Sequence, residues 1–295
     1  MKKKILLIVL MLAMLLTITG CSEEKTIVIA SKPMTEQFVI AEMLIAVIEQ
    51  ETDITVEHKE GVGGGTSNIH PAVINGEVDM YPEYTGTGWM FVLEQALIND
   101  PTELYEEVKA GYMDEFNVYW SELYGFNDTF GIAMKRELAE ELGIETYSDL
   151  AEKSSGLVFG AEHDFFERDD GFPGIDDVYG FNFDKEIGMD IGLKYQAIES
   201  GEVDVINIFS TDGKLKEYDM VVLEDDEYFF PSYYAATLIR QETLDEYPEL
   251  MDAISLLDGQ INNDEMTYMN YLVEIEKMKA KDVAIEFLTE KGILK

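Results

Sequence analysis

Hydrophobic positions along the chain follow two patterns, one typical of strands and the other typical of helices. Thr26–Ala30 has the β-branched composition of a strand, and residues 35–50 repeat apolar side chains at helical spacing. A second strand is predicted over 54–57, and strands and helices alternate as far as Leu223. From about Glu242 the pattern is helical with little strand. This order predicts an α/β protein with largely parallel sheets covered by helices on both faces.

An internal repeat divides this pattern into two similar halves. Residues 72–79 are Ala-Val-Ile-Asn-Gly-Glu-Val-Asp, and residues 197–204 are Ala-Ile-Glu-Ser-Gly-Glu-Val-Asp. Each predicts a helix end, a glycine in the left-handed conformation and the start of a strand. Tyr84 and Phe209 stand eight residues after the two glycines, just beyond the predicted strand ends, where open α/β sheets bind ligands. The repeat therefore predicts that one aromatic residue from each of two lobes faces a shared cleft. The alternative is that this pattern of helix end, glycine and strand start recurs by chance.

The N-terminus has the pattern of a bacterial export signal. Three lysines precede the apolar run 5–16, which is too short to cross a bilayer. Residues 18–21, Ile-Thr-Gly-Cys, resemble the lipobox, so we expect cleavage after residue 20, a diacylated Cys21 and a tether over 21–25. Two acyl chains would hold the protein on the outer face of the cytoplasmic membrane, on the extracellular or periplasmic side. The alternative is an ordinary signal peptide with a coincidental cysteine.

Composition disfavours several kinds of partner and chemistry. Cys21 is the only cysteine, so after acylation no thiol is left for a disulfide, a metal cluster or a nucleophile. The formal net charge of −39, which becomes −42 once residues 1–20 are removed, disfavours nucleic acid and anionic lipid surfaces. The three histidines lack metal-ligand spacing, and acidic clusters such as Asp169-Asp170 are expected on a solvated face. We therefore expect no enzyme activity, no metal and no cofactor.

Two kinds of sequence segment could bind a small molecule. Residues 61–68, Gly-Val-Gly-Gly-Gly-Thr-Ser-Asn, precede a predicted helix, and they form either a tight turn or an anion site made of backbone N–H groups. Aromatic residues gather in the turn-forming segments 81–89, 124–130 and 229–234, where core packing does not explain them. Several ring faces together can hold a quaternary ammonium ion, which has no N–H to donate. The alternative for any single ring is ordinary packing.

Five motifs resemble those of the substrate-binding lipoproteins of compatible-solute ABC importers, which take up glycine betaine, carnitine, choline and related compounds. The motifs are Ser31-Lys-Pro-Met-Thr-Glu-Gln37, Tyr81-Pro-Glu-Tyr-Thr-Gly-Thr87, Tyr124-Gly-Phe-Asn-Asp-Thr-Phe130, Phe209-Ser-Thr-Asp-Gly213 and Phe229-Phe-Pro-Ser-Tyr233. The resemblance covers essentially the whole mature chain. It implies a bilobal type II periplasmic-binding-protein fold with a hinge and a ligand cleft. The expected lobes are 25–121 with 224–295, and 122–223.

The same resemblance implies a ligand site and partners. It places an aromatic cation cage on Tyr84, Phe130, Phe209 and Tyr233, and carboxylate contacts on Lys32 and Thr87. Family members commonly have tyrosine at the positions of Phe130 and Phe209, so two hydroxyls are missing here. The expected partners are a small solute, the ABC permease and ATPase subunits, and the membrane through the N-terminal lipid only. A monomer is expected.

Lys32 favours a zwitterion such as glycine betaine or carnitine over choline, because a lysine pairs with a carboxylate and offers nothing to choline's hydroxyl. Arg168 is either a second carboxylate partner or part of a structural ion pair. If it reaches the cleft, the site would suit a larger solute. The remaining alternatives are another small solute, such as a larger betaine or an amino acid derivative, an enzyme on the same fold, and a surface sensor without a permease.

Overall fold

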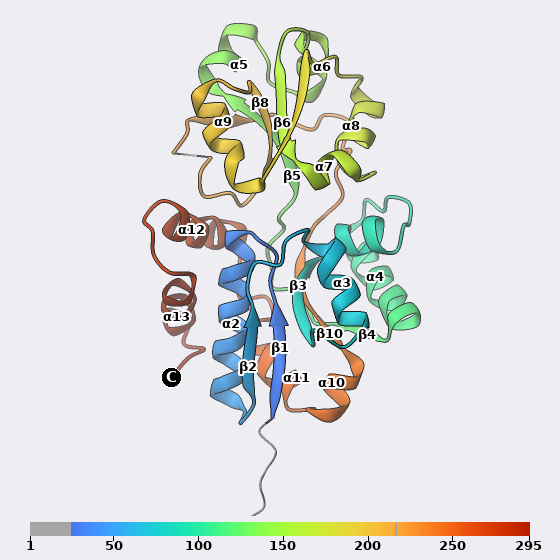
Figure 1. Cartoon of the computed structure of the whole chain (residues 1–295), viewed down its shortest axis with the longest axis vertical. Helices are drawn as coiled ribbons and strands as arrows, with labels where there is room; N and C mark the ends of the chain where they lie inside the picture. Colours follow the sequence, from blue (N-terminus) through green and yellow to red (C-terminus); the bar gives the residue numbers. More distant parts are fainter. Residues whose placement is uncertain (1–24, 216) are drawn as a thin grey trace, which may run out of the picture.

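Two α/β lobes make up the chain, as the computed structural model shows (Figure 1). The structure describes residues 25–215 and 217–295. The predicted signal peptide, Cys21 and most of the predicted tether lie outside the described residues. Each lobe contains one five-stranded sheet with helices packed around it. The predicted bilobal α/β fold is confirmed.

The first lobe contains a sheet of strand order β2-β1-β3-β10-β4. The strands are β1 (Thr26–Ala30), β2 (Thr55–Lys59), β3 (Met80–Tyr84), β4 (Val118–Trp120) and β10 (Ala235–Arg240). The helices are α2 (Thr35–Glu51), α3 (Thr66–Ile74), η1 (Thr87–Val92), α4 (Pro101–Phe116), α10 (Gln241–Glu246), α11 (Leu250–Ile254), η3 (Ser255–Leu257), α12 (Asn263–Glu274) and α13 (Ala280–Glu290). The apolar repeat of α2 is buried between the sheet and α11 to α13, which explains the helical spacing in the sequence.

The second lobe contains a sheet of strand order β7-β6-β8-β5-β9. Its strands are β5 (Phe130–Lys135), β6 (Val158–Glu162), β7 (Lys185–Met189), β8 (Val205–Phe209) and β9 (Met220–Val222). Its helices are α5 (Arg136–Leu142), α6 (Tyr147–Lys153), α7 (His163–Glu167), α8 (Phe172–Tyr179), η2 (Ile191–Leu193) and α9 (Lys194–Ser200). The chain crosses between the sheets over 121–129 and 223–234, and the boundaries expected from the sequence fall in or beside these two segments.

Both sheets are mixed, but in each of them four of the five strands run in the same direction, as the prediction of largely parallel sheets requires. β1 is parallel to β2 and β3, and β6 is parallel to β7 and β8. By contrast, β10 is antiparallel to β3 and β4, and β5 is antiparallel to β8 and β9. The physical reason is that the chain crosses twice between the lobes. β5 and β10 are the first strands after the two crossing segments, so β5 begins where β8 ends and β10 begins where β3 ends. Each therefore runs antiparallel to that neighbour.

The internal repeat is confirmed as a structural repeat. Gly76 after α3 and Gly201 after α9 both have a φ angle of 75°, the left-handed conformation that lets a helix end and the chain turn into a strand. The strands that follow, β3 and β8, end at Tyr84 and Phe209. The two rings are thus the last residues of their strands, one position earlier than predicted.

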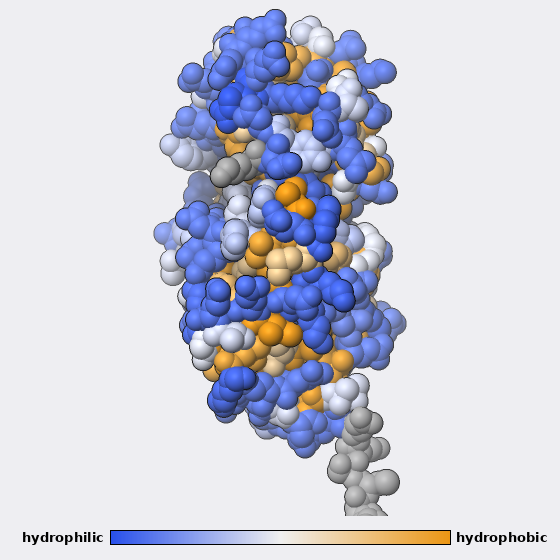
Figure 2. Space-filling model, turned by 90° about the vertical axis from the view of Figure 1, so that its left-hand side faces the viewer, coloured by the Kyte–Doolittle hydropathy of each residue, from blue (hydrophilic) through white to orange (hydrophobic). Residues whose placement is uncertain are grey.

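Hydrophilic side chains cover most of the face shown in Figure 2, with small hydrophobic patches between them. This matches a chain with a formal net charge of −39 whose apolar residues are gathered in cores on both sides of each sheet. Among the described residues, none of the helices combines the length and the apolar character needed to cross a membrane.

Candidate functional site

A cavity of about 500 Å³ lies between the lobes, at the ends of β3 and β8. All seven predicted side chains line it: Lys32, Tyr84, Thr87, Phe130, Arg168, Phe209 and Tyr233. In the same order, these residues lie in the loop after β1, at the end of β3, at the start of η1, at the start of β5, directly after α7, at the end of β8 and in the second crossing segment. The fold therefore brings residues from five separate motifs to one place, and their role in ligand binding stays a prediction.

Phe130 is the centre of the aromatic group. It lies opposite Phe209 in the β5–β8 register, and the two ring centroids are 5.2 Å apart. The centroid of Tyr233 lies 5.3 Å from that of Phe130 with an interplanar angle of 86°. Tyr84 is buried and reaches the cavity from the first lobe. Rings at such angles present both edges and faces to the space between them.

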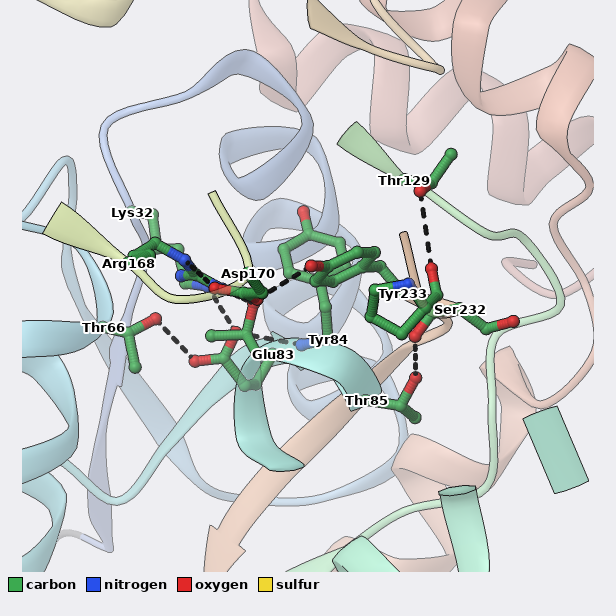
Figure 3. Close-up of polar contacts among 12 residues, drawn as sticks. Lys32, Thr66, Glu83, Tyr84, Thr85, Thr129, Arg168, Asp170, Ser232 and Tyr233 are labelled. Atoms are coloured by element: carbon green, nitrogen blue, oxygen red, sulfur yellow. Dashed lines mark hydrogen bonds and ion pairs between the residues drawn. The ribbon is translucent and has the colours of Figure 1, made fainter. Parts of the chain in front are cut away.

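Lys32 is held by a carboxylate of the protein itself. Its Nζ donates to Glu83, which is 0% exposed and also accepts from Thr66 Oγ1 at 2.8 Å and from the Tyr84 backbone N–H at 2.9 Å. The same ammonium lies 4.8 Å from the centroid of the Tyr84 ring. Burial lowers the pKa of Lys32, and the charge of Glu83 opposes this effect. Figure 3 shows Glu83 between Lys32, Thr66 and Tyr84.

Arg168 forms a structural ion pair, which is one of the two alternatives left open by the sequence, and its role as a carboxylate partner of a solute stays a prediction. It lines the cavity, and it also forms a two-pronged ion pair with Asp170, with Nε to Oδ1 at 2.7 Å and Nη2 to Oδ2 at 2.5 Å. Asp170 accepts a further hydrogen bond from the Tyr233 hydroxyl at 2.8 Å, visible in Figure 3. Nη2 of Arg168 donates to Thr87 Oγ1 across the lobes at 3.3 Å.

Asp170 also corrects the expectation that Asp169-Asp170 forms a solvated face. Asp169 is exposed, whereas Asp170 is 1% exposed. A buried carboxylate is tolerated when charged and neutral donors satisfy its oxygens, and Arg168 and Tyr233 do so here.

Asp128 lines the cavity, and sequence reasoning missed it. Its carboxyl is buried, and this burial, together with the nearby charge of Glu36, raises its pKa well above the ordinary value. The available signal was its position two residues before Phe130 in a motif already singled out. The glycine segment also lies here, since residues 63–66 line the cavity. The backbone N–H groups of Gly65 and Ser67 donate to the carbonyls of Val62 and Gly64, as in a turn.

Two of the aromatic residues singled out in turn-like segments belong to cores instead. Tyr81 is 0% exposed and Tyr124 is 1% exposed, each in a different hydrophobic cluster. Tyr81 and Tyr84 both lie in β3, three positions apart. Since successive side chains of a strand point to opposite faces, only one of the two can reach the cavity.

The cavity has the composition of a small-molecule pocket. Its lining combines aromatic rings with a few charged pairs, as is typical of small-molecule pockets. In residues 25–215 and 217–295, no group of three or more His, Cys, Asp or Glu side chains is arranged to hold a metal ion.

Comparisons with known proteins agree with this geometry. Residues 25–290 match the family described as "Substrate binding domain of ABC-type glycine betaine transport system". The "Ergothioneine transport permease/ergothioneine binding protein EgtU" of Helicobacter pylori is 43% identical over 92% of this chain, which spans about half (48%) of that protein. The "Carnitine transport binding protein OpuCC" of Listeria monocytogenes is 33% identical over 98% of this chain and 97% of its own length.

A solved structure gives the same result. The crystal structure titled "glycine betaine/carnitine/choline ABC transporter" superposes with a TM-score of 0.74 at 32% identity, covering 92% of this chain and all of that one. A choline-binding protein in complex with choline shares the fold, with a TM-score of 0.65 at 13% identity over 90% of this chain and 89% of its own. The chain belongs to the family of substrate-binding domains of ABC-type glycine betaine transport systems.

Proposed function

We propose that this protein captures a quaternary ammonium zwitterion in the cavity between its lobes and delivers it to the permease of an ABC importer. The observation that carries the proposal is that side chains from five separate sequence motifs line one cavity. In this arrangement the cation lies against the rings of Tyr84, Phe130, Phe209 and Tyr233, and the carboxylate lies near Lys32, Thr87 and Arg168. Membership of the family supports a solute of the betaine or carnitine type.

At the cation end, attraction comes from ring faces and from one carboxylate. A trimethylammonium group has no N–H, so hydrogen bonds cannot hold it, whereas each ring face contributes about 0.5 to 2 kcal/mol. Asp128 adds a carboxylate at the cavity wall, beside the aromatic group. The absence of hydroxyls on Phe130 and Phe209 leaves these ring faces unchanged.

At the carboxylate end, each of the two cations already has a carboxylate partner in the protein. Lys32 pairs with Glu83, and Arg168 pairs with Asp170. A solute with zero net charge adds no net charge to this buried set, whereas a simple anion would add one. This balance supports a zwitterion, whose carboxylate accepts from Lys32, Thr87 and Arg168 while its cation lies at the other end.

A larger betaine is the second candidate, and the size of the cavity favours it. A volume of about 500 Å³ corresponds to roughly seventeen water molecules at about 30 Å³ each, more than glycine betaine would fill. Ergothioneine carries a trimethylammonium group, a carboxylate and an imidazole-thione ring with N–H donors. Glu162, Asp164 and Asp190 line the same cavity and could accept from such a ring. The 43% identity with the ergothioneine-binding protein supports this candidate.

A calorimetric titration of the purified protein tests the proposal. We expect saturable binding of at least one of glycine betaine, carnitine and ergothioneine, and weaker binding of choline, which has no carboxylate for Lys32, Thr87 and Arg168. Ergothioneine as the tightest solute would select the larger-betaine alternative. No saturable binding of any of the four would contradict the proposed function.

We also propose that Cys21 is acylated and anchors an extracytoplasmic, monomeric protein to the cytoplasmic membrane. The lipobox pattern of residues 18–21 supports it. Replacing Cys21 with alanine is expected to move the protein from the membrane fraction to the soluble fraction of fractionated cells, with solute affinity unchanged. An alanine variant that stays with the membrane would contradict acylation at this residue.

A further inference from the structure

Two buried carboxylates share one threonine hydroxyl next to the cavity. Glu36 lies in α2 and is 2% exposed, Asp128 lies in the first crossing segment and is 4% exposed, and Thr211 follows β8 and is 1% exposed. Thr211 Oγ1 lies 2.6 Å from Glu36 Oε2 and 2.8 Å from Asp128 Oδ1. Both distances are those of short hydrogen bonds.

One hydroxyl hydrogen cannot serve both contacts. A threonine hydroxyl has a single O–H to donate, and an ionised carboxylate can only accept. If Glu36 and Asp128 were both ionised, one of them would face a lone pair of Thr211 at hydrogen-bond distance. Within residues 25–215 and 217–295, the one further donor to this Asp128 oxygen is the Thr211 backbone N–H, at 3.3 Å. If one of the two carboxyls carries a proton, it donates to Thr211 Oγ1, and the threonine hydroxyl donates to the other carboxylate, so both contacts are hydrogen bonds. The cluster therefore holds one proton.

Burial of the cluster favours this proton, whereas the hydrogen-bond donors around Glu36 oppose it. Tyr84 donates to Glu36 Oε1 at 2.6 Å, and Asn270 of α12 lies 3.4 Å from Oε2. The other titratable groups around the adjoining small cavity are Asp212 and Lys214 after β8, Lys194 and Tyr195 of α9, and Glu274 of α12. Lys194 is paired with Glu162. Burial raises the pKa of Glu36 to about 7.

The cluster joins the two lobes. Glu36 and Asn270 belong to helices of the first lobe, and Thr211 belongs to the second. Asn270 Nδ2 also donates to the Thr211 carbonyl at 2.9 Å. Two residues further, Gly213 lies so close to α12 that an added Cβ would be 2.4 Å from the Tyr271 backbone nitrogen. The shared proton therefore depends on the lobes being together.

We propose that the pair of Glu36 and Asp128 takes one proton from solvent when the lobes close on the solute and returns it when they open. The protonated carboxyl donates its O–H to Thr211 Oγ1, and the threonine hydroxyl donates to the other, ionised carboxylate. The pair thus keeps one negative charge next to the cavity, while Glu36 Oε1 accepts from the hydroxyl of Tyr84. The inference rests on the proposed function, because it assumes a cationic group in the cavity.

The sign of the pH dependence follows from the contacts. When the lobes open, Glu36 is expected to lose part of the burial that raises its pKa, so its pKa should return toward the ordinary value of 4.5, whereas in the closed form it is about 7. The closed form thus binds more protons between these values. Affinity is expected to be highest at low pH, to fall by at most about tenfold per pH unit as pH rises through this window, and to level off above it.

The experiment measures protons taken up on binding. Carnitine and ergothioneine are titrated calorimetrically into the purified protein, in buffers of different ionisation enthalpy. We expect uptake approaching one proton per solute at about pH 6 and near zero at about pH 8. Glu36→Gln, whose amide can donate to Thr211 as a protonated carboxyl does, is expected to abolish the uptake and flatten the pH profile while keeping affinity within a few-fold at the lower pH.

Glu49→Gln is the matched control, since Glu49 is an exposed residue of the same helix. It should keep the proton uptake of the unmodified protein. Thr211→Val removes a donor that stabilises the ionised carboxylates, so it should shift the proton uptake to higher pH, and it replaces Glu36→Gln if that variant does not fold. Saturable binding without proton uptake, or uptake unchanged in both variants, overturns the inference and leaves the proposed function standing. Failure of every solute to bind overturns the proposed function instead.

Discussion

Replacing Glu83 with glutamine is expected to lower the free energy of unfolding by about 3 to 5 kcal/mol, because it leaves the Lys32 ammonium buried without its ionic partner. Glu83 is fully buried and accepts from Lys32, Thr66 and the Tyr84 backbone. The variant also weakens solute binding, since an unpaired buried lysine tends to lose its proton and a neutral amine no longer attracts a carboxylate. Urea denaturation followed by circular dichroism measures the first effect.

The control for this variant is an exposed ion pair of the same kind. Asp219 pairs with Arg136 at 2.9 Å, and both side chains are largely exposed. Asp219→Asn should change the free energy of unfolding by no more than about 1 kcal/mol. Equal effects of the two substitutions would show that burial does not determine how much the Lys32–Glu83 pair contributes to the free energy of unfolding.

Replacing Phe130 with alanine is expected to reduce solute affinity by about 2 kcal/mol, or roughly 30-fold, through loss of one cation-binding ring face. The loss is large because Phe130 also holds its neighbours: its centroid lies 5.2 Å from those of Phe165 and Phe209 and 5.3 Å from that of Tyr233. Stability should fall as well, by about 3 kcal/mol, as for other large core truncations. Calorimetric titration and urea denaturation of the same preparation separate the two effects.

Phe130→Tyr is the matched control, because it keeps the ring face and adds only a hydroxyl. It should retain affinity within a few-fold. If Phe130→Ala bound the solute as tightly as Phe130→Tyr, the cation would not lie against this ring.

Local patterns allowed much of the fold and of the cavity lining to be predicted. Gly76 and Gly201 mark the same helix-to-strand corner twice, and such corners depend on a few neighbouring residues. Once the two strands were placed, their carboxyl ends located Tyr84 and Phe209. The remaining cavity residues came from motifs that resemble a family, and periodicity alone would not have found them.

What the sequence did not predict depends on contacts between distant segments. The partners of Lys32 and Arg168 are Glu83 and Asp170, and nothing local separates these from the many other acidic residues of the chain. The antiparallel strands were missed because their direction depends on where the chain crosses between lobes. Asp128 was missed because a single buried carboxyl looks like any surface aspartate until its neighbours are known.

The position of β10 has a consequence for the order in which the lobes can be completed during synthesis. β10 lies between β3 and β4 in the first sheet, yet its residues, Ala235–Arg240, follow every strand of the second sheet. A nascent chain of 230 residues would contain all of the second sheet and would lack an internal strand of the first. Domains generally fold as units while the chain emerges from the ribosome, so the lobe that is started first must be the one that is finished last.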